Sequence, residues 1–104
     1  MDSKPERFLT AEKKNVIVDS FVKWRIDDVN TFYTAVGGDQ MSANIRLDQV
    51  IKDALRSEFS RREIKQLVST DRGLIREALI KNTALLAKKL GVEIVDVQVK
   101  RIDL

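Results

Sequence analysis

Residues 16–26 alternate between apolar and polar side chains, which is the two-residue repeat of a strand with one buried face. A shorter extended stretch at residues 6–10 precedes this strand, and the polar segment AEKKN joins the two. Because AEKKN contains no glycine, we expect a loop longer than a two-residue turn. The face that we expect to be buried, on which Ser20 also lies, comprises Val16, Val18, Val22, Trp24 and Ile26. The two stretches predict an antiparallel hairpin.

Two apolar residues, Ile17 and Phe21, lie on the otherwise charged face of this strand with Asp19 and Lys23. Apolar side chains scattered over a surface are common in folded proteins. The alternative is a face that another domain or subunit covers. Both interpretations stay open from the sequence, whereas Trp24 on the opposite face is predicted to be a core residue rather than a binding platform.

The repeat changes to that of a helix after residue 28. Asp27 or Asp28 can cap the start of this short helix, and Gly37 can end it. The residues spaced for its buried side are Val29, Phe32, Tyr33 and Val36. The Gly37-Gly38 pair has no phosphate-loop context around it, so it indicates only a helix end.

A longer amphipathic helix is predicted at residues 41–59. Its apolar stripe comprises Leu47, Val50, Ile51, Ala54, Leu55 and Phe59. The sequence from Ser60 to Glu63 matches a capping box, after which we expect a short helix carrying Ile64, Leu67 and Val68. A basic cluster here, Arg56, Arg61, Arg62 and Lys65, is interrupted by Glu58 and Glu63 and has no interleaved aromatic residue. It indicates a solvated helix junction rather than a phosphate site.

The last helix is predicted to run from a cap at Asp71 to Leu90, with Gly91 as its stop. Its apolar arc comprises Leu74, Ile75, Ala78, Leu79, Leu85, Leu86 and Leu90. Asn82 falls inside this arc, so we expect its amide to find hydrogen-bond partners in the core. The chain then closes with a strand over residues 92–102, in which Val95, Val97 and Val99 are predicted to share one face.

A second small apolar strip on the last helix, Ile80, Ala84 and Ala87, lies outside the arc. It is either an ordinary surface or a contact with something beyond the core. With Ile17 and Phe21, these residues are the candidate interface residues of the chain.

The predicted order is two strands, four helices and a returning strand. This order is typical of a two-layer α+β domain, in which an antiparallel hairpin and a C-terminal strand pack against about four helices. We expect Trp24, Leu55, Leu79 and Val97 in its core. At 104 residues the chain forms a single domain, residues 1–104.

Composition removes several classes of function. The chain has no cysteine and no histidine, which excludes disulfides and thiolate metal sites and removes the commonest general base. No catalytic, cofactor-binding or metal-ligating residue is predicted. The enzymatic alternative depends on carboxylate pairs such as Asp27 with Asp28, which are more often helix caps. The net charge of +3 is interleaved along the chain, so a nucleic-acid or anionic-lipid module ranks behind an assembly module. With neither a membrane span nor a signal peptide, the chain itself is expected to be soluble.

Three ordered phrases carry a resemblance to a known family: ERFLTAEKKNVIVDSFVKWRIDDVNTFYTAVGG, LRSEFSRREIKQLVSTDRG and LGVEIVDVQVKRIDL. They resemble the band-7 (SPFH) domain of the stomatin, prohibitin, flotillin and HflK/C proteins, and most of all its HflK/C branch. The resemblance covers nearly the whole chain and corresponds to the later part of that domain. One departure is that LLAKKLG leads directly into VEIVDVQV, where some relatives carry a long insertion.

The resemblance implies a non-enzymatic scaffold without cofactors. In the HflK/C branch it implies a large self-associated assembly with an HflK-like paralogue, which modulates a membrane-bound AAA protease of the FtsH type. It also implies a location on the periplasmic or extracellular side of the inner or plasma membrane, through a membrane segment outside this chain. The alternative within the family is a stomatin- or prohibitin-like membrane-microdomain scaffold with other partners.

Overall fold

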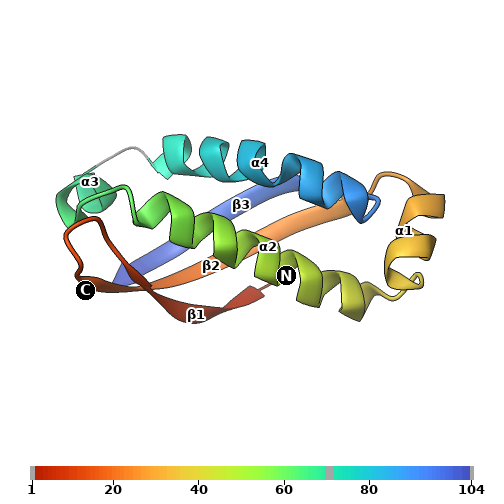
Figure 1. Ribbon diagram of the computed structural model, residues 1–104, viewed down its shortest axis with the longest axis horizontal. Coiled ribbons are helices and arrows are strands. Elements are labelled where there is room, and N and C mark those ends of the chain that lie inside the picture. The colour runs from red at the N-terminus through yellow and green to blue at the C-terminus, as the bar shows by residue number, and fades with distance from the viewer. Residues whose placement is uncertain (1, 70–71, 104) are drawn as a thin grey trace.

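The computed structural model describes residues 2–69 and 72–103 as one antiparallel sheet with helices over one of its faces (Figure 1). The elements are β1 (Asp2–Leu9), β2 (Asn15–Ile26), α1 (Val29–Val36), α2 (Gln40–Phe59), α3 (Ile64–Ser69), α4 (Arg72–Lys89) and β3 (Val92–Asp103). The strands lie in the order β1-β2-β3, and the molecule is elongated, with extents of 43 × 21 × 18 Å. The predicted two-layer α+β architecture and element order are confirmed.

The central strand β2 follows its predicted alternation from Val16 to Val22, whereas Ile26, which was predicted on the buried face, is 47% exposed. Val16, Val18, Ser20 and Val22 are buried beneath the helices, whereas Ile17 on the opposite face is 40% exposed. β1 begins four residues earlier than the predicted stretch and contains a bulge between Ser3 and Glu6. Its loop to β2 is longer than a two-residue turn, as expected, and closes with a hydrogen bond from the Thr10 N–H to the Lys14 carbonyl at 2.9 Å.

The alternation predicted for β3 is wrong at Val95, because β3 contains two bulges, whereas Val97 and Val99 both face the core as predicted. Lys23 pairs with Asp96 but Trp24 pairs with Ile94, so Val95 is an extra residue that opposes nothing on β2. Val95 is accordingly 45% exposed, while Ile94 and Val97 on either side are buried. A second register shift lies between Asp19 and Ser20. Because each bulge adds one residue to β3, the residues beyond it change faces. In this way apolar residues on both sides of the bulge point to the inner face.

The first two helices begin at the predicted positions. Asp28 caps α1 by accepting hydrogen bonds from the backbone N–H of Thr31 at 3.2 Å and its hydroxyl at 2.9 Å, which lowers the pKa of the Asp28 carboxyl. Gly37 ends α1 at a φ of 67°. Asp39 caps α2, whose Leu47, Ile51 and other inner residues are buried.

The predicted capping box at Ser60 is wrong. The Ser60 hydroxyl donates to the Ser57 carbonyl at 2.8 Å, so it belongs to the end of α2. The first residue of α3, Ile64, instead donates its backbone N–H to a carboxylate oxygen of Glu12 at 2.6 Å. A residue of the hairpin loop therefore caps α3, a long-range contact that a local motif cannot indicate.

Helix α4 turns a different side to the sheet from the predicted one. Ile75, Leu79, Thr83 and Ala87 are buried, and the Thr83 hydroxyl donates to the Leu79 carbonyl at 2.7 Å. Asn82 is exposed, and so are Leu74, Leu85 and Leu86, contrary to the predicted arc. The prediction placed Thr83 outside the buried side because threonine is polar. Its hydroxyl is hydrogen-bonded within the helix, so the side chain can be buried at little cost. The predicted cap Asp71 lies outside the described residues.

The core lies between the sheet and helices α2 and α4. Leu55, Leu79 and Val97 are at most 1% exposed, as predicted. Trp24 is half-buried and packs on the edge of this core, with its ring centroid 6.1 Å from that of Phe32. The predicted core is therefore confirmed, with Trp24 at its margin.

Gly91 closes the structure where α4, β3 and α1 meet. It has a φ of 76°, and its carbonyl accepts the N–H groups of Asp27 and Asp28 at 2.8 and 3.0 Å. A Cβ placed on Gly91 would lie 2.4 Å from the backbone nitrogen of Phe32, whereas one on Gly37 would meet nothing within 4 Å. Only glycine fits at position 91.

We therefore expect Gly91→Ala to lower the free energy of unfolding by at least about 3 kcal/mol, because a left-handed backbone penalty adds to a backbone clash. The matched substitution Gly37→Ala carries only the backbone penalty and should cost about 1 kcal/mol. Urea unfolding followed by the fluorescence of the single tryptophan measures both values. Equal losses in the two variants would contradict the close approach at Gly91.

Candidate interaction surfaces

The outer face of the sheet is open, because the helices lie on the inner face only (Figure 1). Ile17, at 40% exposed, and the half-buried Phe21 lie on this face of β2. Leu9 of β1 shares the face and is 49% exposed. The structure thus brings apolar side chains from two neighbouring strands together on one accessible surface.

Charged pairs lie further along the sheet, towards the C-terminal end of β2. Arg25 and Glu93 form a cross-strand ion pair at 2.9 Å, which raises the pKa of the Arg25 guanidinium. Asp96 accepts a hydrogen bond from Arg76 of α4 at 3.0 Å and another from Gln98 at 3.3 Å. The Arg76 contact is the main reason that the pKa of Asp96 lies below its usual range.

A hollow of about 300 Å³ between α4 and β3 collects the other three candidate residues. Ile80 is half-buried, Ala84 is exposed, and Ala87 is only 1% exposed, so Ala87 belongs to the floor of the hollow. The expectation that Ala87 lies outside the core is therefore wrong. The candidates Ile17 and Phe21 lie on a separate surface, so the five candidates form two sites rather than one.

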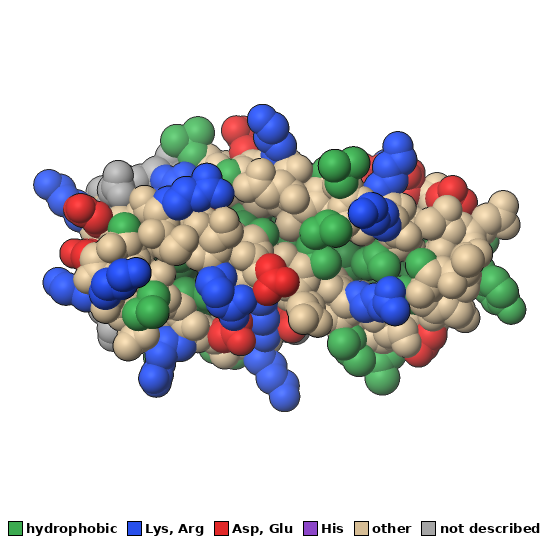
Figure 2. All heavy atoms as spheres, in the orientation of Figure 1, with side chains coloured by type: hydrophobic (Ala, Val, Ile, Leu, Met, Phe, Trp, Pro, Cys, Tyr) green, Lys and Arg blue, Asp and Glu red, His purple; other side chains and the backbone are tan. Residues whose placement is uncertain are grey.

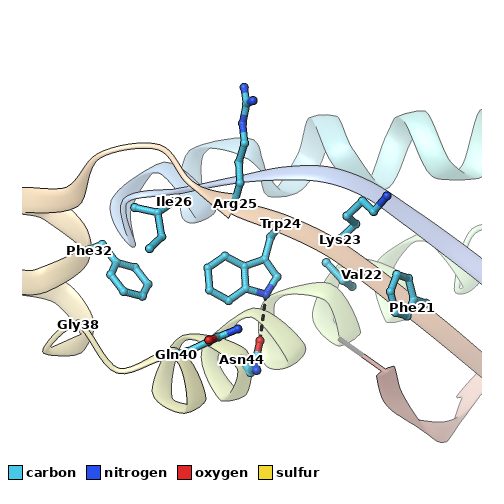
Figure 3. Close-up of a pocket in the computed structure, with 10 residues that line it drawn as sticks. All are labelled: Phe21, Val22, Lys23, Trp24, Arg25, Ile26, Phe32, Gly38, Gln40 and Asn44. Atoms are coloured by element: carbon cyan, nitrogen blue, oxygen red, sulfur yellow. Dashed lines mark hydrogen bonds between the residues drawn. The ribbon is translucent and has the colours of Figure 1, made fainter.

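A larger hollow, about 600 Å³, lies beside the end of β2 and was missed by the sequence reasoning (Figure 3). The described residues of β1 end opposite Phe21, whereas β2 continues to Ile26. The Trp24 indole N–H points across the hollow and donates to the Asn44 side-chain oxygen at 2.9 Å, and Gln40 lies beside Asn44. Its lining combines the indole, two side-chain amides and aliphatic and aromatic side chains with the cations Lys23 and Arg25.

The basic cluster at the α2–α3 junction is engaged in local contacts. Arg56 pairs with Asp53 at 3.1 Å and stacks over the ring of Phe8, and Arg62 pairs with Glu58 at 2.9 Å. Arg56, Arg61 and Lys65 are exposed, as a solvated junction requires, whereas Glu58 is only 6% exposed, so its pair with Arg62 is largely buried and not solvated.

Two further features of the described ranges concern metal binding and membrane spanning. Residues 2–69 and 72–103 place no three acidic side chains where they could hold a metal ion together. Over the same ranges, no helix combines the length and the apolar character needed to cross a membrane.

Comparisons with a family model and with individual proteins agree on the family of this chain. The model described as "SPFH domain / Band 7 family" matches residues 1–104. Protein HflC of Haemophilus influenzae is 43% identical over 108 positions, which cover 100% of this chain and 37% of that relative. Protein HflC of Vibrio parahaemolyticus is 37% identical over 135 positions, covering 100% and 41%. The Escherichia coli K12 protein named "Modulator of FtsH protease HflC" is 43% identical over 89 positions, covering 81% and 27%.

The chain spans less than half the length of these relatives. The alignment with the Vibrio protein is longer than the 104 residues of this chain, so that relative carries insertions within the matched region. This chain is therefore a compact version of the region that it matches.

The ion pair at Asp96 predicts a pH dependence. Because the pKa of Asp96 is lower in the folded chain than its unfolded value near 3.8, its contribution to stability is full above that value and is lost as the pH falls through the folded pKa. Asp96→Asn should lower stability at pH 7 and reduce the further loss between pH 5 and about pH 2. Urea unfolding across this range measures both effects.

Asp19→Asn is the matched control. Asp19 of β2 lies on the same outer face of the sheet as Asp96. Within the described residues, no hydrogen bond or ion pair holds the Asp19 side chain. If this substitution changed the acid dependence as much as Asp96→Asn, the Arg76–Asp96 contact would not be its cause.

Proposed function

Because the chain belongs to the SPFH domain / Band 7 family, we propose that it is the assembly region of an HflC-like scaffold that modulates an FtsH-type protease. The observation that carries this proposal is the similarity to HflC proteins, which in two of them extends over the whole of this chain; another relative bears the name "Modulator of FtsH protease HflC". The open surfaces described above support binding as its mode of action.

We propose that the scaffold acts without chemistry of its own. The chain has no histidine or cysteine, and its described surface hollows are lined by aliphatic, aromatic and amide groups with charged side chains at their margins. The partners in this proposal are an HflK-like paralogue, further copies of the chain and the protease. The full protein would hold the domain at the periplasmic or extracellular side of a membrane through a segment outside these 104 residues.

Two surfaces are proposed for lateral contacts. One is the outer sheet face with Ile17 and Phe21, and the other is the α4–β3 hollow with Ile80, Ala84 and Ala87. They lie on different elements, so one copy can offer the first surface to the second surface of its neighbour. Such head-to-tail contacts close into rings when the rotation between copies allows it.

The function is tested by replacing the matched region of the Escherichia coli relative with this chain. In cells lacking their own HflC, the chimera should restore the lifetime of a reporter protein degraded by FtsH. The same chimera carrying Gly91→Ala is the control for a region that does not fold. A folded chimera that assembles but leaves the lifetime unchanged would favour a scaffold acting on other partners.

The isolated chain should be mainly monomeric at micromolar concentration. Its lateral contacts are small, and they lack the raised effective concentration that an anchored assembly provides. Sedimentation velocity measures the distribution of species. A stable ring formed by residues 1–104 alone would contradict this expectation.

Within the chimera, Ile17→Asp, Phe21→Asp and Ile80→Asp together should abolish assembly, because each places a charge in an apolar contact. Exposed Leu85, at 75%, lies on neither proposed surface, so Leu85→Asp is the matched control. Chemical cross-linking in membranes followed by size separation reports the outcome. Normal assembly of the triple variant would remove both surfaces from the proposal.

A further inference from the structure

A third surface lies on the outside of the helical layer. Side chains of α2 and α4, with Ala35 of α1, form a groove of about 520 Å³ on the helical layer, and apolar side chains are visible along it in Figure 2. The apolar lining comprises Ala35, Val50, Leu86 and Leu90. Leu86 is 47% exposed and Val50 is half-buried, so the groove is open to solvent although its floor is aliphatic.

The lining residues have the spacing of two helix faces. On α2 they are Arg46, Gln49, Val50 and Asp53, and on α4 they are Leu86, Lys89 and Leu90. The α2 set recurs at i, i+3, i+4 and i+7, which forms a strip two turns long, or about 10 Å. Because α2 and α4 run in opposite directions side by side (Figure 1), a third helix could pack along both of them over the groove.

The rim of the groove carries uncompensated positive charge. Within the described part of the chain, neither Arg46 nor Lys89 has an ion-pair or hydrogen-bond partner through its side chain. Asp53, the carboxylate on the same rim, is already paired with Arg56 at 3.1 Å. An occupant with carboxylates at its flanks would therefore meet two free cations beside an apolar floor.

Helix α4 is apolar on more sides than the sheet can cover. Ile75 and Leu79 are fully buried against the sheet, while Leu85 is 75% and Leu86 47% exposed. Of the exposed leucines, Leu86 lines the groove, whereas Leu85 lies outside its lining. The groove side of α4 therefore leaves the large apolar side chain of Leu86 partly exposed beside the buried Leu90.

We propose that the α2–α4 groove binds an acidic amphipathic helix of another protein. Large aliphatic side chains of that helix fill the space between Val50 and Leu86, and its flanking glutamate or aspartate residues pair with Arg46 and Lys89. This site is separate from the two lateral surfaces proposed above, and it does not depend on them.

A second copy of this chain fits the groove less well. The exposed pair Met41 and Ile45 on α2 is the nearest equivalent of such a helix, but its neighbouring carboxylates are engaged. Asp39 caps α2 through the Met41 N–H at 3.2 Å, and Asp48 pairs with Lys52 at 3.1 Å. A flat lipid surface also fits a concave groove poorly, so a separate acidic helix is the favoured occupant.

The test uses the 104-residue chain and a synthetic peptide of about 15 residues, with leucines at i, i+3, i+4 and i+7 and flanking glutamates. Fluorescence anisotropy should show saturable binding that weakens as salt is raised, and amide chemical shifts should change along the groove residues of α2 and α4. Arg46→Glu with Lys89→Glu should weaken binding about tenfold or more.

The double substitution Lys4→Glu with Lys81→Glu is the matched control, since it changes the net charge equally at exposed positions outside the groove. It should leave binding within about twofold. The proposal is overturned if both double variants bind equally, or if a peptide with lysines in place of the glutamates binds as tightly. It is also overturned if the chain does not bind the peptide but binds phosphatidylglycerol vesicles, and Arg46→Glu with Lys89→Glu abolishes that vesicle binding.

Discussion

The close approach of the chain at Gly91 fixes how the helices meet the sheet. At this point α4 ends, β3 begins, and the Gly91 carbonyl accepts both N–H groups that precede α1. Because the Phe32 backbone lies where a side chain would start, α1 is held against the end of the sheet without room for slippage. On the same side of this junction, the Phe32 ring packs against Trp24, with 6.1 Å between the ring centroids.

One-sided coverage of the sheet is the second consequence of the architecture. With α2 and α4 both packed on the inner face, the outer face stays uncovered in the described residues and carries cross-strand pairs such as Arg25 with Glu93. Antiparallel sheets tolerate such exposure because strand side chains alternate between the two faces. In this chain the alternation is imperfect, since Ile17 and Phe21 break the polar pattern on the open face. The same imperfection recurs on α4, where apolar side chains remain outside the core.

The sequence predicted best those elements whose pattern is local. The alternation of β2, the Asp28 cap and the Gly37 and Gly91 stops needed only neighbouring residues to interpret. The bulge at Val95 could not be predicted from neighbouring residues, because its position depends on how β3 pairs with β2.

The predictions for the buried side of α4 and for the cap of α3 failed for related reasons. A hydrophobicity scale counts Thr83 as polar and so rotates the predicted arc towards Asn82, although the threonine hydroxyl is satisfied within its own helix. Glu12 caps α3 from far away in the sequence, and no local motif reports such a contact. The candidate interface residues were found because they break a pattern, whereas the Trp24 hollow and the α2–α4 groove arise only when separate elements come together.

The placement of these surfaces bears on how a scaffold of this kind can work. The lateral contacts proposed on the outer sheet face and in the α4–β3 hollow would use residues distinct from those that line the groove between α2 and α4. Copies associated through these proposed contacts would then leave each groove free, and a ring of copies would present many identical grooves. A partner with several acidic helices, or several partners held together, would then bind with an avidity well above that of one groove. Under this arrangement, a chain with modest individual affinities can still hold a partner firmly once it is assembled, and can release it when the assembly comes apart.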